Sequence, residues 1–452
     1  MKLSKLRVAV LGLGLSGRAA VRFLLKRGAS VTGIDGNRDH LANHPDMALF
    51  RAEGCALVHE EEVKDLKSQD LLVVSPGVPP HHRIWQLARE ANLPIIGEVE
   101  LAFREIAIPC IGVTGTNGKT TVTLLITHVL NSCGHKALAL GNVGVALTDA
   151  VDTLEQEKCA YAVVELSSFQ IDTMQEPCLD SAILLNITPD HLDRYQTMDA
   201  YARSKAHITD LLVEGGAFYL EQAAFEQYRP LFAQIDPILY GYDPSCSVVA
   251  KEGVITIDGK SQLKLPSTYG TRRSHDVENI MAAFAVCHRY GVTGEQFIKA
   301  LETFQKPKHR IEFVTVDSGV RYYDDSKGTN IDAVIRAVET VQGPIVLIAG
   351  GVDKGAPYLP WISAFAGKVK AVCAIGQASP MIKRDLEPHV PVSVYTTLEE
   401  AVDAAKKNAN AGDAILLSPG CASYDMFKDY AHRGEEFQRI VHSKTSLKRG
   451  DS

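Results

Sequence analysis

Short apolar runs alternate with amphipathic stretches along this chain, and most runs end in glycine or polar residues. The first runs cover residues 6–11, 30–35 and 70–74, and a helical pattern over residues 18–27 separates the first two. Apolar runs of this length are typical of strands buried on both faces of a parallel sheet. Their alternation with helices predicts a small parallel α/β domain in the first ~100 residues.

The same pattern occurs twice more along the chain. At 452 residues the chain is too long for one core, and it fits three α/β domains of roughly 150 residues each. We place them at residues 1–98, 99–307 and 308–452, with a hinge at Lys306-Pro307-Lys308. Further strands are expected over residues 109–113, 161–165, 181–186, 320–324, 345–349 and 414–418, and further helices over residues 122–130 and 199–212, around Asn279 and from Ile331.

A glycine-rich turn between an expected strand and helix carries the clearest chemistry. It reads Gly115-Thr116-Asn117-Gly118-Lys119-Thr120-Thr121. Backbone amides at a helix N-terminus cradle phosphates, Lys119 would neutralise them, and the Thr120 hydroxyl would bind Mg²⁺. Only two residues separate Gly115 from Gly118, where the usual P-loop has four. The turn predicts an ATP site in a P-loop-like central domain; a plain glycine turn with a solvated lysine is the alternative.

A second glycine pattern, Gly12-Leu13-Gly14-Leu15-Ser16-Gly17, follows the first strand, and Asp35 ends the second. Strand, G-x-G-x-x-G, helix and a later acid are the fingerprint of a Rossmann-like dinucleotide-binding domain. The loop Ser75-Pro76-Gly77 follows the third strand and would lie at the same edge of the sheet. Taken alone, this domain favours an NAD-dependent dehydrogenase.

Polar residues also follow the later strands of the central domain. Glu165 ends one strand and could complete a Mg²⁺ site opposite Thr120, although it could also cap a helix. His191 lies in the dense polar block 186–194 and is a candidate ligand for a second metal; an exposed turn is the alternative. Lys205 lies on the expected helix 199–212, where spacing alone predicts a solvated lysine.

In the last domain, Lys327, Thr329 and Lys354 follow successive strands along the chain. We expect these side chains at one edge of a Rossmann-like sheet, where they would bind a carboxylate or phosphate. Helix N-caps could account for the hydroxyl residues one by one.

Composition narrows the class of protein. The net charge of −7 and a pI near 6.1 give no electrostatic footprint for nucleic acid. No apolar stretch approaches the ~18 residues of a membrane span, and no signal peptide is expected. The nine cysteines include no C-x-x-C pair, which fits reduced thiols in a cytoplasmic protein.

Taken together, these blocks resemble the Mur ligases over nearly the whole chain. The branch that adds D-glutamate is indicated by residues 12–17 with 75–77 and by the closing block 417–427; the Asp-Asn-Pro-Arg block of the diamino-acid-adding relative is absent. The signature-like blocks are residues 115–121, 165–170, 186–194, 309–310 and 324–330.

The resemblance implies an ATP-dependent acid–amino-acid ligase of peptidoglycan precursor synthesis. Such an enzyme joins D-glutamate to UDP-N-acetylmuramoyl-L-alanine through an acyl phosphate and releases ADP and phosphate. It further implies two Mg²⁺ ions and carbamylation of Lys205 by CO₂, and we expect a cytoplasmic monomer whose third domain swings in during the reaction. His191 or a metal-bound oxygen is a hypothetical base for the incoming amine.

The resemblance also assigns roles residue by residue. Lys119, His191 and Lys205 would be catalytic, and the metal ligands would be Thr120, Glu165, His191 and carbamylated Lys205. The UDP-sugar would contact Leu15, Ser16, Asp35, Ser75, Pro76, Gly77, Asn142 and His191. ATP would contact Gly115, Thr116, Asn117, Gly118, Lys119, Thr120, Thr121, Asn279, His309, Arg310, Asp325 and Lys327, and D-glutamate would contact Thr329, Lys354, Ser423 and Tyr430.

Two positions depart from the family pattern: Asp276 replaces an expected asparagine near the adenine, and Gly36 replaces a hydroxyl residue near the uracil. Three rival functions stay open, and one feature argues against each. A folylpolyglutamate synthetase would lack the front domain, and a dehydrogenase would leave the Gly-Lys-Thr turn without a role. A non-catalytic nucleotide-binding module would need no metal ligands.

Overall fold

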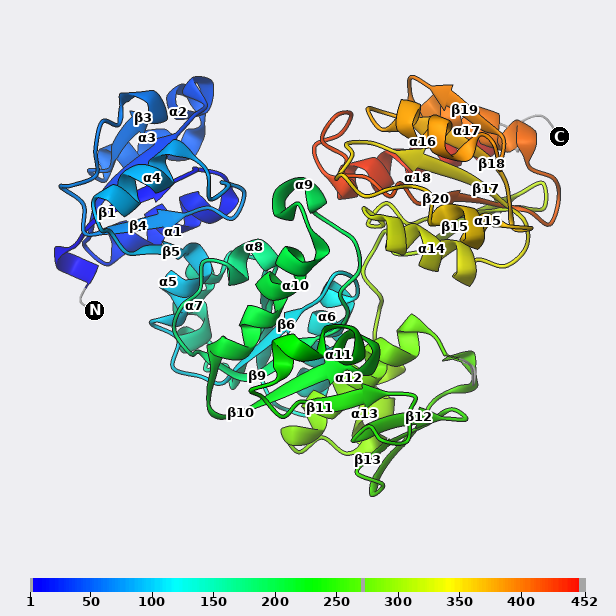
Figure 1. The fold of residues 1–452 in the computed structure, drawn as a ribbon, viewed down its shortest axis with the longest axis horizontal. Coiled ribbons are helices and arrows are strands. Elements are labelled where there is room, and N and C mark those ends of the chain that lie inside the picture. Colours follow the sequence, from blue (N-terminus) through cyan, green and yellow to red (C-terminus); the bar gives the residue numbers. More distant parts are fainter. Residues whose placement is uncertain (1–2, 270–272, 447–452) are drawn as a thin grey trace. The chain divides into compact units, whose positions relative to one another are not determined.

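The computed structural model describes residues 3–269 and 273–446. Within these residues the strands form sheets of five, nine and six strands, each from a continuous part of the chain (Figure 1). Most strands pair in parallel and alternate with helices, as the pattern of apolar runs predicts. The described residues belong to two compact units, of which the first comprises 1–187 with 202–304 and the second 188–201 with 305–452.

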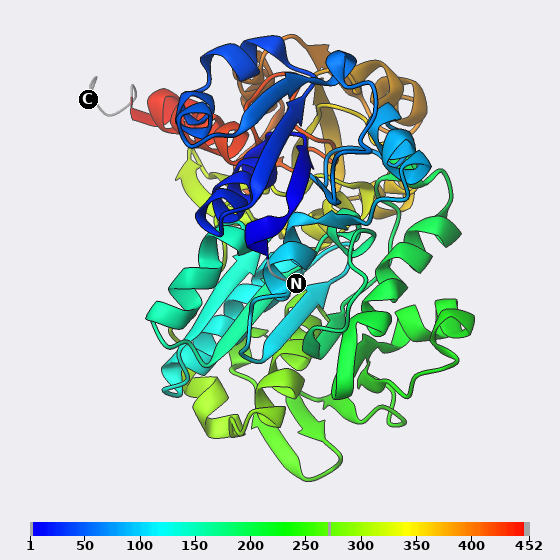
Figure 2. The same ribbon diagram turned by 90° about the vertical axis from the view of Figure 1, so that its left-hand side faces the viewer.

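The five-stranded sheet is entirely parallel, in the order β3-β2-β1-β4-β5, which is the strand order of dinucleotide-binding folds. Figure 2 shows its strands side by side in blue. Four of the five residues of β1 and all of β4 are buried, as expected for strands covered on both faces. The elements are β1 (Arg7–Leu11), α1 (Leu15–Lys26), β2 (Ser30–Asp35), α2 (Arg38–Asn43), α3 (Pro45–Ala52), β3 (Ala56–His59), β4 (Leu71–Val74), α4 (Arg83–Glu90), β5 (Ile95–Gly97) and α5 (Glu98–Phe103).

The nine-stranded sheet has the order β14-β13-β12-β11-β10-β9-β6-β8-β7. Its strands from β7 to β12 pair in parallel, and β13 and β14 extend it as antiparallel hairpins. Its core packs α6 and α12 against the sheet. The strands are β6 (Cys110–Thr114), β7 (Ala137–Gly141), β8 (Tyr161–Glu165), β9 (Leu179–Leu184), β10 (Leu212–Glu221), β11 (Ile238–Gly241), β12 (Val248–Lys251), β13 (Val254–Ile257) and β14 (Ser261–Lys264).

The helices of this part are α6 (Lys119–Ser132), α7 (Leu147–Gln156), α8 (Ser168–Ile171), α9 (Leu192–Tyr195), α10 (Met198–Ala206), α11 (Gln222–Tyr228), α12 (His275–Arg289) and α13 (Gly294–Leu301). The single helix expected over residues 199–212 is thus shorter. It ends at Ala206, and a 3₁₀ turn over His207–Leu211 leads into β10. The Thr209 hydroxyl donates to the Ala206 carbonyl, which stabilises that tighter turn.

The six-stranded sheet has the order β15-β16-β20-β17-β18-β19, and only β15 is antiparallel to its neighbour. Separate apolar clusters, one around Trp361 and one around Phe437, cover it. Its elements are β15 (Glu312–Asp317), β16 (Val320–Asp324), α14 (Ile331–Thr340), β17 (Ile345–Gly350), α15 (Trp361–Phe365), β18 (Val369–Ile375), α16 (Ser379–Leu386), β19 (Val392–Tyr395), α17 (Leu398–Asn408), β20 (Ala414–Leu417) and α18 (Tyr430–Ser446).

Strand order decides which loops meet. Because β9, β6 and β8 are neighbours and parallel, the turns that follow them emerge at one edge of the nine-stranded sheet. In the same way β16, β20 and β17 bring the loops after Asp324, Leu417 and Gly350 to one edge of the six-stranded sheet. The predicted domain boundaries at 98/99 and 307/308 stay predictions. In the described part of the chain, no helix combines the length and the apolar character needed to cross a membrane.

Candidate active site

The turn between β6 and α6 depends on two glycines with positive φ. Gly115 has a φ of 147° and Gly118 a φ of 89°. Both values lie in the positive-φ region, where a residue with a side chain would be strained. A Cβ on Gly118 would lie 2.5 Å from Oδ1 of Asn279, and one on Gly115 would lie 2.9 Å from Cβ of Leu185. The turn therefore packs directly against Asn279, which places two of the predicted ATP contacts side by side.

Asn186 holds this turn in place. Its Oδ1 accepts a hydrogen bond from the Asn117 amide at 2.8 Å, and its Nδ2 donates to the Asn117 carbonyl at 3.0 Å. Its own carbonyl accepts from the Thr116 amide at 2.9 Å. Asn186 was absent from the predicted site residues, although it opens the polar block 186–194. Its role depends on the pairing of β9 with β6, which the sequence does not reveal.

The two predicted catalytic lysines of this part meet at one carbonyl oxygen. Lys119 Nζ donates to the carbonyls of Gly115 and Thr116, both at 2.8 Å. Lys205 Nζ donates to the same Gly115 carbonyl at 2.8 Å. Lys205 is only 1% exposed, so the solvated surface lysine expected from helical spacing is wrong. Lys205 therefore lies against the phosphate turn and not on a solvated helix face.

Glu165 ends β8 and is 1% exposed. Its Oε1 accepts from Nδ2 of Asn142 at 2.7 Å, whereas its buried Oε2 has no hydrogen-bond partner among the described residues. A buried carboxylate oxygen without a partner is costly, and a cation would satisfy it. The alternative of a helix-capping acid does not hold, since Ser167 caps α8 with Gln170 in a capping box. The donor set therefore fits a hard cation such as Mg²⁺.

Six of the eight residues predicted for the UDP-sugar lie at or beside the first glycine turn, whereas Asn142 follows β7 and His191 belongs to the second unit. Asp35 accepts from the amides of Leu13 at 2.6 Å and Asn37 at 2.8 Å, and Ser75 Oγ donates to the Gly12 carbonyl at 2.6 Å. Leu15 is 80% exposed at the tip of the turn. Asp35 and Ser75 thus fix the backbone of the turn from two sides. Ser16 follows Leu15 in α1, and Pro76 and Gly77 continue the Ser75 loop.

One departure from the family pattern, the glycine at residue 36, lies against the side chain of Glu60. A Cβ at this position would lie 2.9 Å from the carboxylate of Glu60. His82 Nε2 lies 3.1 Å from Glu60 Oε2, and its Nδ1 accepts from the Ile84 amide, so Nε2 carries the donating hydrogen. The Glu60 carboxylate consequently occupies the space that a side chain at residue 36 would take.

In the second unit, Lys354 lies between Thr329 and an acid. Its Nζ is 3.4 Å from Thr329 Oγ1 and 3.1 Å from Oδ1 of Asp190, and Asn330 donates to the other oxygen of Asp190 at 3.2 Å. Burial opposes the charge on Asp190, but Lys354, His191 and Asn330 still lower its pKa to about 2. The adjoining cavity of about 10 Å³ has room for about one water. Asp190 was absent from the predicted site residues.

The remaining predicted residues of this unit form a second group. Lys327 Nζ lies 3.8 Å from the centre of the Tyr430 ring, a cation–π contact. Asp325 accepts from Ser418 Oγ at 2.7 Å, and burial raises its pKa to about 7. Two further predicted residues belong to the same unit: Ser423 is buried, and Arg310 is half-buried.

Arg433 on α18 stabilises the loops that carry these residues and was not predicted. Its guanidinium is 1% exposed and donates to Oγ and the carbonyl of Ser326, both at 2.9 Å. It also donates to the Cys421 carbonyl at 3.2 Å. Burial lowers its pKa to about 10, which leaves it charged at neutral pH. One buried cation therefore connects the loops after β16 and β20.

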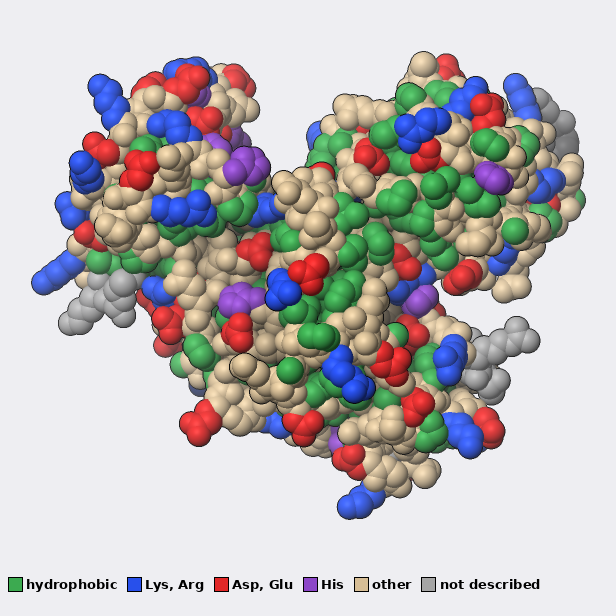
Figure 3. Space-filling view, in the orientation of Figure 1, with side chains coloured by type: hydrophobic (Ala, Val, Ile, Leu, Met, Phe, Trp, Pro, Cys, Tyr) green, Lys and Arg blue, Asp and Glu red, His purple; other side chains and the backbone are tan. Residues whose placement is uncertain are grey.

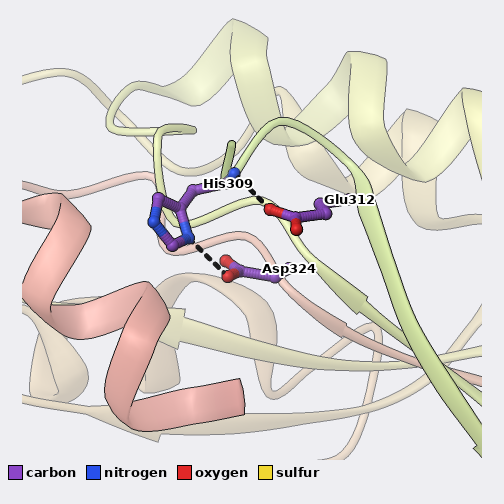
Figure 4. A group of neighbouring side chains, drawn as sticks. All are labelled: His309, Glu312 and Asp324. Carbon is purple, nitrogen blue, oxygen red and sulfur yellow. Dashed lines mark hydrogen bonds and ion pairs between the residues drawn. The ribbon is translucent and has the colours of Figure 1, made fainter. Parts of the chain in front are cut away.

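His309 points inward (Figure 4). Its Nδ1 lies 2.7 Å from Oδ2 of Asp324, and its backbone amide donates to Glu312 at 2.8 Å. A Cβ on Gly434 of α18 would lie 2.2 Å from His309 Nδ1, so the helix covers the ring closely. The hydrogen bond to Asp324 raises the pKa of His309, although burial acts against it. Its carbonyl accepts from the Lys327 amide at 3.0 Å, which connects this pair to a predicted ATP residue.

The predicted metal ligands divide between the units. Thr120, Glu165 and Lys205 belong to the first, together with Asn142, Asn279 and the phosphate turn, and His191 belongs to the second. Thr120 and Thr121 are buried in the first turn of α6. On the face shown in Figure 3, acidic and basic side chains are interspersed on both units.

Comparison with known proteins gives a family for each part of the chain. A Mur ligase MurD-like N-terminal domain matches residues 6–97, a Mur ligase middle domain residues 113–287, and a Mur ligase glutamate ligase domain residues 309–421. A UDP-N-acetylmuramoylalanine--D-glutamate ligase of Protochlamydia amoebophila is 50% identical over 96% of this chain and 97% of its own. The chain belongs to the Mur ligase family.

Other relatives agree with this assignment. The enzyme of the same name from Caldanaerobacter subterraneus is 36% identical over 98% of this Mur ligase and 99% of its own chain. Among solved structures, the UDP-N-acetylmuramate-alanine ligase of Thermotoga maritima covers 97% of this chain with a TM-score of 0.59 at 18% identity. Its whole length is matched, which shows a shared fold. The predicted family and the three-part α/β fold class are confirmed.

We predict that Asn186→Ala weakens binding of Mg-ATP about tenfold, since two hydrogen bonds of the turn are lost at about 1 kcal/mol each, partly offset by solvent. Binding is measured by titration calorimetry. Asn131→Ala is the matched control, because Asn131 makes side-chain bonds to Thr127 and Ala137 at the far end of α6. Unchanged ATP affinity in Asn186→Ala would contradict the role of Asn186.

We predict that Asp324→Asn destabilises the protein more at about pH 6 than at about pH 9. The pKa of His309 is raised above its unfolded value, so the stabilisation from this pair is full below the unfolded pKa and is lost as the pH rises through the folded one. Urea unfolding at both pH values measures the difference. Gln438→Ala removes an uncharged donor to the same Asp324 oxygen, at 2.8 Å, and should cost the same at both.

Proposed function

We propose that this Mur ligase joins D-glutamate to UDP-N-acetylmuramoyl-L-alanine, with conversion of ATP to ADP and phosphate, in peptidoglycan precursor synthesis. The observation that carries the proposal is the 50% identity to a ligase of that name over nearly the full length of both chains. The MurD-like N-terminal domain over residues 6–97 supports the UDP-sugar. Nine free cysteines fit a reducing compartment, so we place the enzyme in the cytoplasm. That it acts as a monomer stays a prediction.

In the first step the terminal carboxylate of the UDP-sugar attacks the γ-phosphate of ATP. A carboxylate O–P bond forms, the bond to ADP breaks, and an acyl phosphate results. The amide groups of residues 115–121 and the Lys119 ammonium offset charge on the phosphates, and Asn186 keeps the turn in shape for them. The α6 N-terminus adds its dipole to the same end.

In the second step the amine of D-glutamate attacks the acyl carbon. The C–N bond forms, phosphate leaves with the electron pair of the broken C–O bond, and the amine loses a proton. His191, whose Nε2 lies 3.6 Å from Oδ2 of Asp190, is the proposed acceptor of that proton. This role excludes a metal-ligand role in the same step, because a neutral imidazole has a single free lone pair. Lys354, Thr329, Ser423 and Tyr430 are the proposed contacts of the D-glutamate carboxylates, and Asn279, His309, Arg310, Asp325 and Lys327 those of ATP.

Thr120, Glu165, His191 and Lys205 are the proposed holders of two Mg²⁺ ions, and the unpartnered Oε2 of Glu165 supports this. Bound Mg²⁺ would neutralise phosphate charge as it develops in the transition state. Lys205 would contribute as a carbamate: its neutral amine bonds to the carbon of CO₂, a proton leaves, and an anionic oxygen ligand replaces a cation. The burial of Lys205 at the phosphate turn, beside the Gly115 carbonyl, supports this position for the carbamate.

We predict that phosphate release with ATP, Mg²⁺, bicarbonate and UDP-N-acetylmuramoyl-L-alanine requires D-glutamate. L-glutamate, D-aspartate and a diamino acid should give at least about tenfold lower turnover, because a site with buried polar groups rejects ligands that leave them unpaired. The amide product is identified by mass spectrometry. Release with a different amino acid would refute the proposed specificity, and turnover of a folate substrate instead would favour the folylpolyglutamate synthetase reading.

We predict a carbamate on Lys205. Protein equilibrated with ¹³C-bicarbonate should show one protected carbamate carbon by NMR, and Lys205→Ala should lose this signal together with nearly all activity. Lys67→Ala, at an exposed lysine, should keep both. A fully active wild-type protein without the signal would refute the carbamate.

A further inference from the structure

Glu98 is a buried acid that the reaction as described does not use. It begins α5 directly after β5 and is 2% exposed. Its Oε1 accepts hydrogen bonds from the backbone amide of Thr148 at 2.6 Å and from the Thr148 hydroxyl at 2.7 Å. Thr148 lies in the first turn of α7, so the carboxyl group binds the N-terminus of that helix, where amides have no partner inside the helix.

Three ion pairs bind the same helix to α1 of the dinucleotide-type domain. Arg22 pairs with Asp149 at 2.7 Å, and Lys26 and Arg27 pair with Asp152 at 2.6 and 3.0 Å. Helix α1 follows the glycine turn proposed for the UDP-sugar diphosphate. Helix α7 is therefore packed against two helices that belong with the five-stranded sheet, α5 and α1 (Figure 1).

The turn that leads into α7 reaches the proposed metal ligand Glu165. Asn142 follows β7 in this turn; its amide donates to the Glu165 carbonyl at 2.9 Å and its side chain to Glu165 Oε1 at 2.7 Å. Gly141 has a φ of 93°, and a Cβ there would lie 2.5 Å from the Glu165 carbonyl oxygen. The turn is thus in close contact with the end of β8, and a shift of α7 would be passed on to Asn142.

We propose that Glu98 is a positioning residue for the metal site: through Thr148 it fixes α7, and the turn before α7 then orients Asn142 and the Glu165 carboxylate. The inference rests on the proposed function, because Glu165 is assigned there as a Mg²⁺ ligand. It gives the front domain a direct physical influence on the metal site. A shift of a few tenths of an ångström is enough to spoil ligand geometry, since Mg²⁺ demands near-ideal octahedral coordination.

Burial raises the pKa of Glu98 to about 7, against the lowering effect of the bonds from Thr148. A neutral amide of the same shape should therefore replace it well. We expect Glu98→Gln to behave as wild type, because its amide oxygen accepts both bonds. Glu98→Ala loses both bonds, whereas Thr148→Val loses the hydroxyl bond and keeps the bond from the backbone amide. Thr148→Ser keeps both and should behave as wild type.

The test measures binding of Mn²⁺, as a probe for the Mg²⁺ site, to the ATP-saturated protein by electron paramagnetic resonance. We expect Glu98→Ala to weaken Mn²⁺ binding about tenfold and Thr148→Val to weaken it by a smaller factor, because Val keeps the backbone-amide bond. Both should raise the Mg²⁺ concentration for half-maximal turnover, with the KM for D-glutamate unchanged. Glu100→Ala is the matched control: Glu100 is an equally buried acid on α5 that binds Arg104 and the amide of Gln175, away from α7. It should lose stability but keep Mn²⁺ affinity.

Wild-type Mn²⁺ affinity in folded Glu98→Ala, or an equal loss in Glu100→Ala, would overturn the inference. Loss in Glu98→Gln as large as in Glu98→Ala would overturn it as well. The binding readout needs no amino-acid substrate, so it is independent of the proposed reaction. Wild-type protein that binds Mn²⁺ with ATP but shows no D-glutamate-dependent turnover would refute the proposed function and leave the inference standing.

Discussion

The carbonyl oxygen of Gly115 is the point on which the chemistry of the first unit depends. A φ of 147° turns this residue so that its carbonyl faces Lys119 and Lys205. Side chains other than glycine would strain there, and a Cβ would collide with Leu185. Asn186 then fixes the next residues through both polar ends of its amide. The proposed phosphate binding and the burial of Lys205 thus depend on one backbone conformation.

Buried charge is the second shared constraint. Lys205, Glu165, Asp190 and Arg433 are all under 9% exposed, and each would cost several kcal/mol without compensation. The Asp190 charge has Lys354 beside it, and Arg433 donates to several carbonyls, but Oε2 of Glu165 has no described partner. An unsatisfied buried group is tolerated in native structures mainly where a ligand completes it. The buried oxygen without a described partner, Oε2 of Glu165, thus lies at the proposed metal site.

The sequence predicted local structure well and tertiary roles poorly. Strands 30–35 and 161–165 have the predicted bounds, because apolar runs between polar ends depend on burial within the run itself. The glycine turns were also predictable, since their spacing reflects backbone conformation. Asn186 and Arg433 were missed because most of their partners are backbone groups in loops far away in the sequence. Helical spacing likewise gave no signal for the burial of Lys205.

The first domain shows how a fold pattern can mislead about function. Its strand order and glycine turn are those of a dinucleotide-binding domain, and Asp35 stands where such folds hold a ribose. Yet both oxygens of Asp35 accept backbone amides, from Leu13 and Asn37, and so shape the turn itself. The same acid can serve the loop in one protein and the ligand in another, which is why fold alone does not assign chemistry.

What distinguishes this domain is its connection to the rest of the first unit. The helix after its glycine turn is held to α7 by Arg22, Lys26 and Arg27. Its last strand leads directly into Glu98, the first residue of α5, which also binds α7. Exposed ion pairs contribute little each, whereas a buried acid bound to a helix N-terminus cannot move without losing two hydrogen bonds. The buried contact therefore sets the position of α7, and the ion pairs limit its rotation.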